Sequence, residues 1–371
     1  MRVKLEEVCE RGSSNLKQSD VIDKTGEYPV YGATGYLGNV DFYHQEKPYV
    51  AVVKDGAGIG RTTLYPSKSS IIGTMQYLLP KENVLPEYLC YVVRYMHLEK
   101  YFTGATIPHI YFKDYKNEEF NLDTLDRQIE IVGILKKVEN IIELRRQEIE
   151  KLDDLIKSRF VEMFGDMFLN TMRWNEHPLE SMADIVSGIT KGRKIKEQSM
   201  IKVPYMAVSN VKDGYIDWTT VKTIEATERE IEQYRLLPDD VLMTEGGDPD
   251  KLGRGAIIKE PLENCIHQNH IFRVRLNESM ILPIFFAEYL KHQKSKRYFL
   301  GCAKQTTGIA SINMRQLKAL PVLLPPLELQ ERFVTFVAQT DKSKLTIQKS
   351  LDELEILNKA LMQKYFGGNE V

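Results

Sequence analysis

The chain has 371 residues, of which 43% are hydrophobic and 27% charged, and its formal net charge is −2. This length is enough for two or more domains with cores of their own. The near-neutral charge gives no whole-chain sign of nucleic-acid binding, so any contact with DNA must come from local patches. Because no apolar run reaches the roughly 18 residues of a membrane span and the N-terminus lacks an apolar signal stretch, we expect a cytoplasmic protein.

Residues 1–123 are predicted to form a first globular domain that mixes short strands and helices. Strand-like runs cover residues 28–31, 49–53 and 70–73, and glycine-rich turns separate them. A helix is predicted over residues 86–102, because a proline stands at its first turn. The four cysteines of the chain are far apart and form no Cys-x-x-Cys motif, so we expect free thiols and neither a zinc ribbon nor a disulfide framework.

Residues 124–165 have the heptad pattern of a long helix. Apolar residues recur every three or four positions and charged residues dominate between them, which predicts packing on a partner helix. Some 40 residues at about 1.5 Å per residue would make a rod of roughly 60 Å. The apolar positions predicted to face the partner helix, called the seam here, are Ile131, Leu135, Val138, Ile142, Ile149, Leu152, Ile156 and Met163.

The chain then repeats its own order. Residues 166–323 are predicted to form a second globular domain and residues 324–367 a second rod. Gln128 of the first rod matches Gln330 of the second with a shift of 202 residues, and the same shift relates the Phe-Gly pairs that end both rods. The seam residues of the second rod are Phe333, Val337, Ile347, Leu351, Leu354 and Leu361.

The two rod sequences match without an insertion or deletion. This indicates that both rods are held to one length, because an insertion would rotate the seam away from its partner. We therefore predict an α+β fold with a pseudo-twofold internal repeat. Two mixed α/β domains would be separated by two long antiparallel coiled-coil helices, with the domains at opposite ends. Long bundle helices, or rods that each pair with another chain, are the alternatives.

Catalytic motifs are missing from the sequence. We find no Walker A loop and no Asn/Asp-Pro-Pro-aromatic motif of an amino-methyltransferase. His267 and His270 have the spacing of two ligands on a helix, but their segment reads as a strand, where they would face opposite sides. We therefore expect no metal site and a protein that binds rather than catalyses.

Several stretches together resemble one family. They are residues 28–35, 53–58 and 106–110, the matched rod entries at 123–128 and 325–330, and the Phe-Gly rod ends. In order and spacing, with the duplicated plan, they resemble the DNA-specificity subunit of type I restriction-modification systems. Asp123-Thr124 stands where Pro-Pro is usual before the first rod, and either residue can cap a helix.

The resemblance implies a sequence-specific DNA-binding subunit without catalysis of its own. Each globular domain would be a target recognition domain that reads one half of a bipartite double-stranded DNA site. The coiled coil would fix the spacing and dock two methyltransferase subunits, and motor-nuclease restriction subunits would join for cleavage. S-adenosylmethionine, ATP and Mg are expected on those partners and not on this chain.

The residues expected near DNA combine basic side chains beside glycine turns with Asn, Gln, Ser and Thr side chains that can read base edges. In the first domain they are Tyr31, Thr34, Lys54, Arg61, Thr106 and His109. In the second domain they are Ser209, Asn210, Arg254, Gln268, Lys304, Gln305 and Thr307. For each a purely structural role is the alternative, and His109 could equally be a capping or core residue. The alternative for the whole chain is a non-catalytic coiled-coil adaptor with two protein- or glycan-binding domains.

Overall fold

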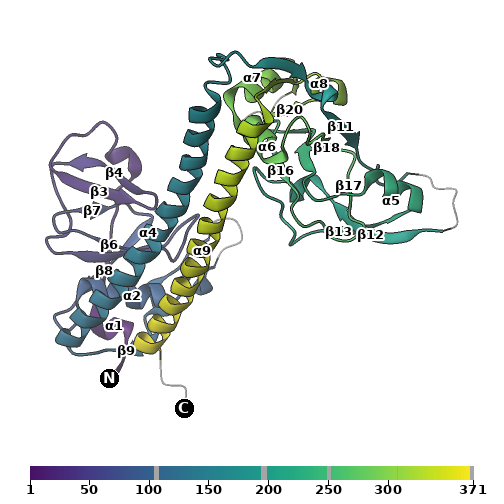
Figure 1. Cartoon of the computed structure of the whole chain (residues 1–371). Coiled ribbons are helices and arrows are strands. Elements are labelled where there is room, and N and C mark those ends of the chain that lie inside the picture. Colours follow the sequence, from purple (N-terminus) through teal and green to yellow (C-terminus); the bar gives the residue numbers. More distant parts are fainter. Residues whose placement is uncertain (104–107, 194–198, 249–251, 307, 368–371) are drawn as a thin grey trace. The chain divides into compact units, whose positions relative to one another are not determined.

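A computed structural model describes residues 1–103, 108–193, 199–248, 252–306 and 308–367. The chain divides into two compact units. Unit 1 comprises Met1–Glu148 and Ile347–Val371, and unit 2 comprises Ile149–Thr346. Two 40-residue helices, α4 (Leu125–Phe164) and α9 (Leu327–Phe366), each contribute one part to each unit (Figure 1). Within the described residues no helix is long and apolar enough to span a membrane.

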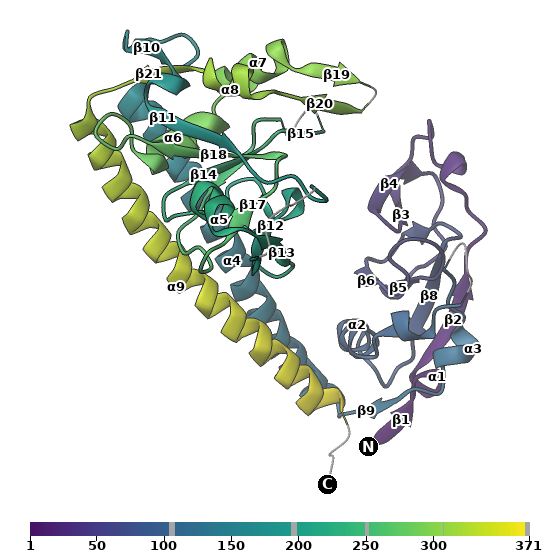
Figure 2. The ribbon, with the colours of Figure 1, turned by 90° about the vertical axis from the view of Figure 1, so that its right-hand side faces the viewer.

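Unit 1 contains the first globular part, residues 2–121. Its elements are β1 (Arg2–Lys4), α1 (Leu5–Val8), β2 (Cys9–Ser13), η1 (Gln18–Asp20), β3 (Tyr28–Gly32), β4 (Gly35–Val40), β5 (Tyr49–Val53), β6 (Thr62–Tyr65), β7 (Ser70–Ile71), β8 (Met75–Pro80), α2 (Pro86–Tyr95), η2 (Leu98–Tyr101), α3 (Phe112–Tyr115) and β9 (Glu119–Asn121). The strands form sheets in the orders β2-β8-β5-β6 and β4-β3-β7, and the pair β1-β9 (Figure 2). Strands β3, β5 and β7 confirm the three predicted strand-like runs.

Strand β5 is an interior strand of the four-stranded sheet, and all five of its residues are buried. Successive side chains point to opposite faces of a sheet, and β5 follows that rule. Val50 and Val52 belong to one hydrophobic cluster with helix α2, whereas Tyr49, Ala51 and Val53 belong to a second cluster with aromatic residues of the neighbouring strands. The continuous apolar run at 49–53 thus forms a strand with a core on each face.

Unit 2 contains the second globular part, residues 175–324. Its elements are β10 (Asn175–Pro178), η3 (Leu179–Ser181), β11 (Ala183–Ser187), β12 (Ile201–Met206), η4 (Val208–Asn210), β13 (Lys222–Ala226), α5 (Glu228–Tyr234), β14 (Val241–Thr244), β15 (Gly246–Gly247), β16 (Gly255–Ile257), β17 (Ile266–His267), β18 (Ile271–Leu276), α6 (Pro283–Lys291), α7 (Gln293–Cys302), β19 (Lys304–Thr306), β20 (Ile309–Ser311), α8 (Met314–Lys318) and β21 (Pro321–Leu324).

The strand orders of unit 2 repeat those of unit 1. The sheet β11-β18-β14-β16 corresponds to β2-β8-β5-β6, the sheet β13-β12-β17 to β4-β3-β7, and the pair β10-β21 to β1-β9. The directions agree as well, because β3 pairs with β7 in parallel and β12 pairs with β17 in parallel. A further sheet, β15-β20-β19, belongs to unit 2. The internal repeat predicted from short sequence matches is therefore a repeat of the complete sheet framework.

The helix predicted over residues 86–102 is shorter than expected. Helix α2 ends at Tyr95, and His97 has a φ of 50°, in the left-handed region. A residue in that conformation cannot continue a right-handed helix. The chain therefore turns at His97, and the 3₁₀ helix η2 follows.

A buried glutamine fixes the start of each long helix. Gln128 accepts a hydrogen bond from the backbone N–H of Leu85 (2.8 Å) and donates to the carbonyl oxygens of Asn83 (3.0 Å) and Asp123 (2.9 Å). Gln330 repeats the pattern: it accepts from the N–H of the residue before α6 (2.9 Å) and donates to two backbone carbonyls. Both side chains are fully buried. Each glutamine therefore accepts a hydrogen bond from the backbone N–H of the residue just before a helix that begins with proline. That N–H would otherwise have no hydrogen-bond partner.

The last residue of each long helix closes a globular core. Phe164 of α4 is buried in the core of unit 2, with its ring edge-on to Phe285 at 4.8 Å between centroids. Phe366 of α9 is buried in the core of unit 1, edge-on to Tyr88 at 5.1 Å. The Phe-Gly ends noted in the sequence are thus packing residues of equivalent cores.

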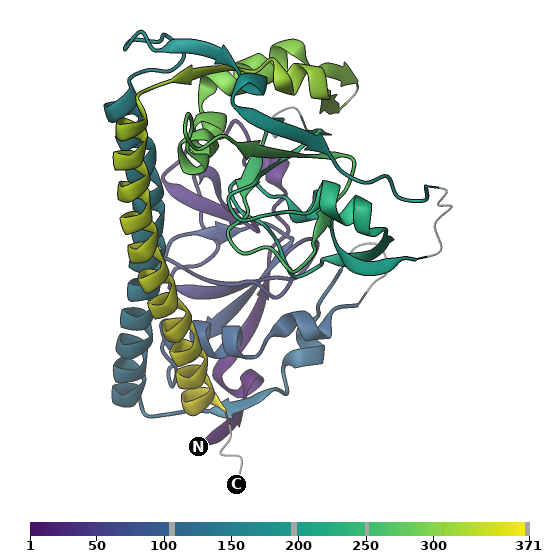
Figure 3. The same ribbon diagram turned by 45° about the vertical axis from the view of Figure 1, so that its right-hand side comes forward.

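The two long helices run antiparallel within each unit. In unit 1, Arg146 of α4 forms an ion pair with Glu355 of α9 (2.7 Å), whereas Arg127, earlier in α4, lies over the ring of Tyr365, later in α9. The helix parts of unit 2 contact each other in the same sense (Figure 3). The α+β fold class with two long antiparallel helices is confirmed.

The structure places every predicted seam residue in the interior or at its margin. The fully buried ones are Ile131, Leu135, Val138, Ile142, Ile156, Met163, Phe333, Val337 and Leu351. The half-buried ones are Ile149, Leu152, Ile347, Leu354 and Leu361. Four of the five half-buried seam residues, at 149, 152, 347 and 354, lie near the positions where each helix passes from one unit to the other, although Leu351 among them is buried.

Candidate nucleic-acid interface

The loop after strand β5 is held in a closed shape by its own backbone. Gly60 donates to the carbonyl of Val53 (2.9 Å), and Gly56 donates to the carbonyl of Pro108 (3.0 Å). The φ angle of Gly60 is 80°, a conformation that favours glycine, and a Cβ there would lie 2.7 Å from the backbone nitrogen of Glu99. The glycines therefore let three chain segments converge at this end of β5.

Two of the residues predicted near DNA, Lys54 and His109, meet around this loop with Asp55 between them. Asp55 accepts a hydrogen bond from Nδ1 of His109 (2.7 Å), and its other carboxylate oxygen is 3.5 Å from Nζ of Lys54. The backbone N–H of Ile110 donates to the carbonyl of Lys54 (2.9 Å). All three side chains are partly exposed. The residues at 54 and 109 are therefore neighbours at the surface, although 55 positions separate them in the chain.

Arg61 connects the same loop to the β3–β4 hairpin. Its Nη1 donates to the carbonyl of Ala33 (3.0 Å), next to the exposed Thr34 at the hairpin turn. Tyr31 of β3 stacks on Tyr65 at 4.2 Å between ring centroids, and its partial burial raises the pKa of its hydroxyl above the ordinary value. The structure thus brings together five of the six predicted residues of the first part. Thr106 lies outside the described residues.

The corresponding loop of unit 2 has the same backbone bonds with different side chains. Lys54 donates its N–H to the carbonyl of Thr74 (3.0 Å), and Glu245 donates to the carbonyl of His270 (2.9 Å). The carbonyl of Glu245 accepts from the N–H of Ile312 (2.8 Å), as that of Lys54 does from Ile110. Glu245 therefore occupies the position of Lys54, and it forms an ion pair with Nδ1 of His270 (2.5 Å). The two parts therefore carry a lysine and a glutamate at the same framework position.

The prediction that Asn210 contacts DNA is corrected by its surroundings. Its side chain is fully buried. The amide nitrogen donates to the carbonyl of Asp217 (2.9 Å) and to Oγ1 of Thr220 (3.1 Å), and the amide oxygen accepts from the N–H of Ala207 (2.9 Å). With these three bonds inside the protein, Asn210 holds the loop after β12 and is not placed to read a base edge.

The other predicted residues of the second part have mixed surroundings. Ser209 and Lys304 are exposed. Gln268 is half-buried, and its Oε1 accepts a long hydrogen bond from the N–H of Val208 (3.3 Å). Arg254 is half-buried, and its buried Nε has no hydrogen-bond partner in the part of the chain that the structure describes. Gln305 lies in β19 opposite Ala310, and Thr307 lies outside the described residues.

His267 and His270 face different environments. His267 is fully buried, with its two ring nitrogens 3.1 Å from the carbonyl of Tyr234 and 3.3 Å from that of Val186. Burial lowers the pKa of His267 to about 4, because the charged imidazole would lose its hydration. His270 is exposed and paired with a carboxylate. Among the described residues no group of three or more His, Cys, Asp or Glu side chains could hold a metal ion.

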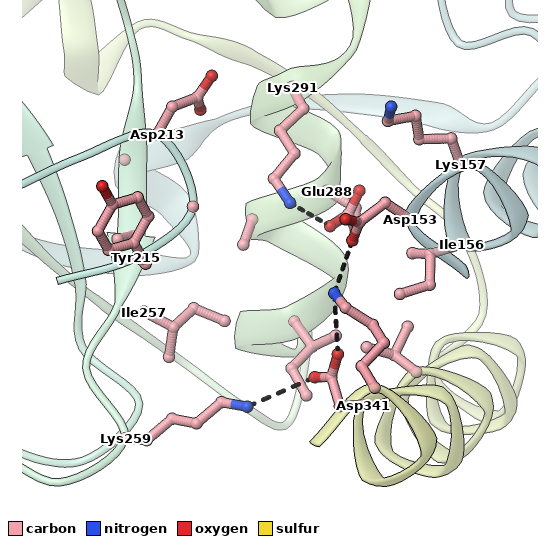
Figure 4. Close-up of a pocket in the computed structure, with 17 residues that line it drawn as sticks. Asp153, Ile156, Lys157, Asp213, Tyr215, Ile257, Lys259, Glu288, Lys291 and Asp341 are labelled. Carbon is pink, nitrogen blue, oxygen red and sulfur yellow. Dashed lines mark hydrogen bonds and ion pairs between the residues drawn. The ribbon is translucent and has the colours of Figure 1, made fainter. Parts of the chain in front are cut away.

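A cavity of about 500 Å³ lies in unit 2 between the two long helices, helix α6 and loops of the second globular part (Figure 4). Lys344 of α9 lies 2.6 Å from Asp153 of α4 and 3.7 Å from Asp341. Asp341 also faces Lys259, from the loop after β16, at 3.5 Å. Because these lysines already pair with carboxylates, the network braces the second globular part against both helices and offers no excess positive charge to phosphate.

Two of the side chains that shape these surfaces were missed in the sequence, namely Asp55 and Glu245. No local motif marks them, because each partner histidine is supplied by a different segment of the chain. His270 was noted only for its spacing from His267. The signal that could have found Glu245 is its place after the second buried strand, matching the loop after the first one.

The chain has two α+β modules of one topology, which an antiparallel pair of long helices joins. The modules differ in the polar groups at one edge. These features define a class of two-module binding proteins. A profile of the family described as "Type I restriction modification DNA specificity domain" matches residues 1–154 and 172–356. The chain belongs to this family. The adaptor alternative has no support in these matches.

Known relatives agree with this assignment. A putative type I restriction enzyme MjaX specificity subunit of Methanocaldococcus jannaschii is 30% identical over 190 residues, which are 51% of this chain and 45% of that protein. The EcoKI specificity subunit of Escherichia coli K12 is 25% identical over 177 residues, 46% of this chain and 38% of that protein. The matched region thus spans less than half the length of either relative.

Two solved structures share the fold along almost the whole chain. A crystal structure of the type I restriction-modification S subunit from M. genitalium has a TM-score of 0.58 at 17% identity, covering 99% of this chain and 96% of that one. A chain from a structure of type I R-M complex assembly and conformational transition has a TM-score of 0.59 at 15% identity, covering 98% and 97%.

Proposed function

We propose that this chain is the DNA-specificity subunit of a type I restriction-modification complex and that each globular part reads one half of a bipartite double-stranded DNA site. The observation that carries the proposal is the pair of equivalent loops after β5 and β14. They share backbone bonds but carry Lys54 in one and Glu245 in the other. A shared scaffold that carries different side chains at the equivalent loop suits the reading of two different half-sites. Bases are distinguished by the donor and acceptor patterns of their edges.

The contact residues of this proposal come from both parts, now without Asn210. They are Tyr31, Thr34, Lys54, Arg61, Thr106 and His109 in the first part, and Ser209, Arg254, Gln268, Lys304, Gln305 and Thr307 in the second. The first set has the stronger support, because five of its members converge on one loop and hairpin. Its lysine and arginine suit phosphate contacts, and its hydroxyl and imidazole groups suit base edges.

The long helices are assigned two roles in this proposal. Their paired length sets the spacing between the half-sites, and their outer faces dock two methyltransferase subunits, with motor-nuclease subunits joining for cleavage. The recognition domains would cover residues 1–123 and 166–323, and the spacer helices residues 124–165 and 324–367. The chain itself would be non-catalytic and cytoplasmic, with S-adenosylmethionine, ATP and Mg bound by its partners.

Replacement of residues 166–323 by those of a relative tests the proposal. The hybrid is assembled with the methyltransferase subunits of the same system, and the methylated sites are mapped across a genome. One half of the recognised site is expected to change and the other to stay. A change in both halves would contradict the assignment of one half-site to each part.

Insertion of one heptad into both long helices tests the spacer role. The recognised halves are expected to stay the same while the number of base pairs between them rises, or activity is lost. An unchanged spacer in an active complex would refute the role. DNA affinity should also fall steeply with salt, since phosphate contacts release counterions.

A further inference from the structure

Each globular part carries a histidine–carboxylate pair at the same edge of its framework. In the first part Nδ1 of His109 is 2.7 Å from Asp55, and in the second Nδ1 of His270 is 2.5 Å from Glu245. The imidazole side chains are 37% and 56% exposed and the carboxylates 28% and 34% exposed. Both pairs are therefore accessible to an external ligand while being held against the loop.

The two pairs are built from different framework positions. Ile110 and Ile312 are equivalent, so His109 occupies the position that Ser311 has in the second part. The N–H of Lys54 bonds to Thr74 and that of Glu245 bonds to His270, so His270 occupies the position that Thr74 has in the first part. The carboxylates also differ by one position, since Glu245 matches Lys54 and not Asp55. A histidine–carboxylate pair thus occurs at the same edge of both parts but is built from different framework positions. This is not expected of side chains that serve only the shared scaffold.

The pairs are not needed to close their loops. In the first part, backbone bonds from Gly56 to Pro108 and from Ile110 to Lys54 already join the segments that Asp55 and His109 connect. In the second part, the backbone bond from Glu245 to the carbonyl of His270 and the pairing of β14 with β18 join the segments that Glu245 and His270 connect. Exposed ion pairs contribute little to stability, so a structural role alone does not account for both.

The geometry limits what each imidazole can do. A bond from Nδ1 to a carboxylate fixes the ring orientation and leaves Nε2 as the nitrogen for an outside partner. The carboxylate offsets positive charge on the imidazole, so the pair has little attraction for phosphate. A base edge in a groove, with its neutral donors and acceptors, is the better match.

We propose that Asp55 and Glu245 are positioning residues that hold His109 and His270 for Nε2 contacts with base edges, one contact in each half-site. The proposal rests on the proposed function. It adds His270 to the DNA-contacting residues and gives Asp55 and Glu245 a role through the imidazoles and not through DNA itself.

The test uses the full chain assembled with its methyltransferase subunits. Binding is measured by competition with duplexes that carry each single base-pair change in the recognised site. The variants are Asp55→Asn, His109→Ala, Glu245→Gln and His270→Ala. The matched control is His97→Ala, which removes an exposed histidine of the first part that pairs with Glu99 at 3.2 Å and is not among the proposed contact residues.

The expected loss is confined to one base pair in each half. Asp55→Asn and His109→Ala should both reduce discrimination at the same base pair by about tenfold or more. Glu245→Gln and His270→Ala should do so at one base pair of the other half. The salt dependence of binding should not change, since no phosphate contact is removed. The double variant Asp55→Asn/His109→Ala should behave like His109→Ala, and the control like the parent.

Uniform weakening across all duplexes with a smaller salt slope would overturn the proposal in favour of phosphate contacts. Unchanged discrimination in all four variants, with bipartite recognition intact, would also overturn it and leave the proposed function standing. A parent complex without any bipartite preference would overturn the proposed function and this proposal together. Circular dichroism of each variant verifies the fold.

Discussion

The first and second globular parts have the same sheet orders, yet they differ most where their strands end. The β3–β4 hairpin turns within two residues, whereas a long connection, residues 207–221, joins β12 to β13 and includes the 3₁₀ turn η4. Isolated bridges join residues 55, 103 and 109 in the first part, where the second has the sheet β15-β20-β19. The framework therefore sets where polar loops are displayed, and the loops can diverge without disturbing the core.

Substitutions in the two hydrophobic cores are expected to have the largest effects on stability and so test this comparison first. Phe164→Ala and Phe366→Ala each remove a fully buried ring, and we expect each to lower the free energy of unfolding by about 3–5 kcal/mol. Phe164 should cost more, because its ring contacts Phe160, Phe285 and Phe333. Urea unfolding followed by circular dichroism measures both. Phe168→Ala, at a side chain that is 41% exposed, is the control, and equal losses in all three variants would contradict the packing described.

The helix starts should respond alike in the two parts. Gln128→Ala and Gln330→Ala each leave one backbone N–H and two carbonyls without a partner. We expect a loss of about 2–3 kcal/mol in the free energy of unfolding for each. Gln147→Ala, at an exposed glutamine bonded to Glu143, should change little. A large effect of one substitution and none of the other would show that the repeat in geometry is not a repeat in energy.

Acid should weaken the second part more than the first. Ile71 occupies the position in β7 that His267 occupies in β17, so only the second part has a titrating group there. The pKa of His267 is lowered to about 4 in the folded chain, against about 6.5 when unfolded. Protonation therefore favours the unfolded state. Stability is complete above pH 6.5 and falls as the pH drops towards 4, by roughly 3 kcal/mol at most.

Urea unfolding at several pH values measures this effect. His267→Gln removes the titrating group, so the pH dependence between 6.5 and 4 should become shallower. A variant with the same pH dependence as the parent would rule out His267 as its source.

The smallest effect is expected in the helix pair itself. Lys344 lies at the seam position that Ile142 occupies in the other long helix, 202 residues earlier. It is held by partly exposed ion pairs with Asp153 and Asp341, which contribute little. Lys344→Ile should therefore change the free energy of unfolding by less than about 1 kcal/mol and reduce its salt dependence. A loss above 2 kcal/mol would assign the bracing network a larger role.

Regular patterns allowed much of the fold to be predicted. The heptads located both long helices, and the constant shift of 202 residues identified the repeat, because packing in a seam tolerates no gap. The predicted helix over 86–102 was too long, since nothing in the local sequence signals the left-handed conformation of His97.

The candidate site was predicted less completely. Residue types beside glycine turns found Lys54, Arg61 and His109, which the fold brings together. They did not find Asp55 as the partner of His109, because a contact across 54 residues depends on loop closure. Asn210 was wrong for the opposite reason: an amide that suits a base edge also suits a buried turn, and burial decides between them.

The burial of Phe366 in the core of unit 1 has a consequence for the order in which the protein matures. During synthesis the strands of the first globular part emerge first, but their core is completed only by residues 347–366. Unit 2, by contrast, draws on residues 149–346 alone. The part that is synthesised first is therefore the last to complete its core. A chain that is truncated before residue 366 would lack a core residue of the N-terminal domain, although the truncation is at the C-terminus.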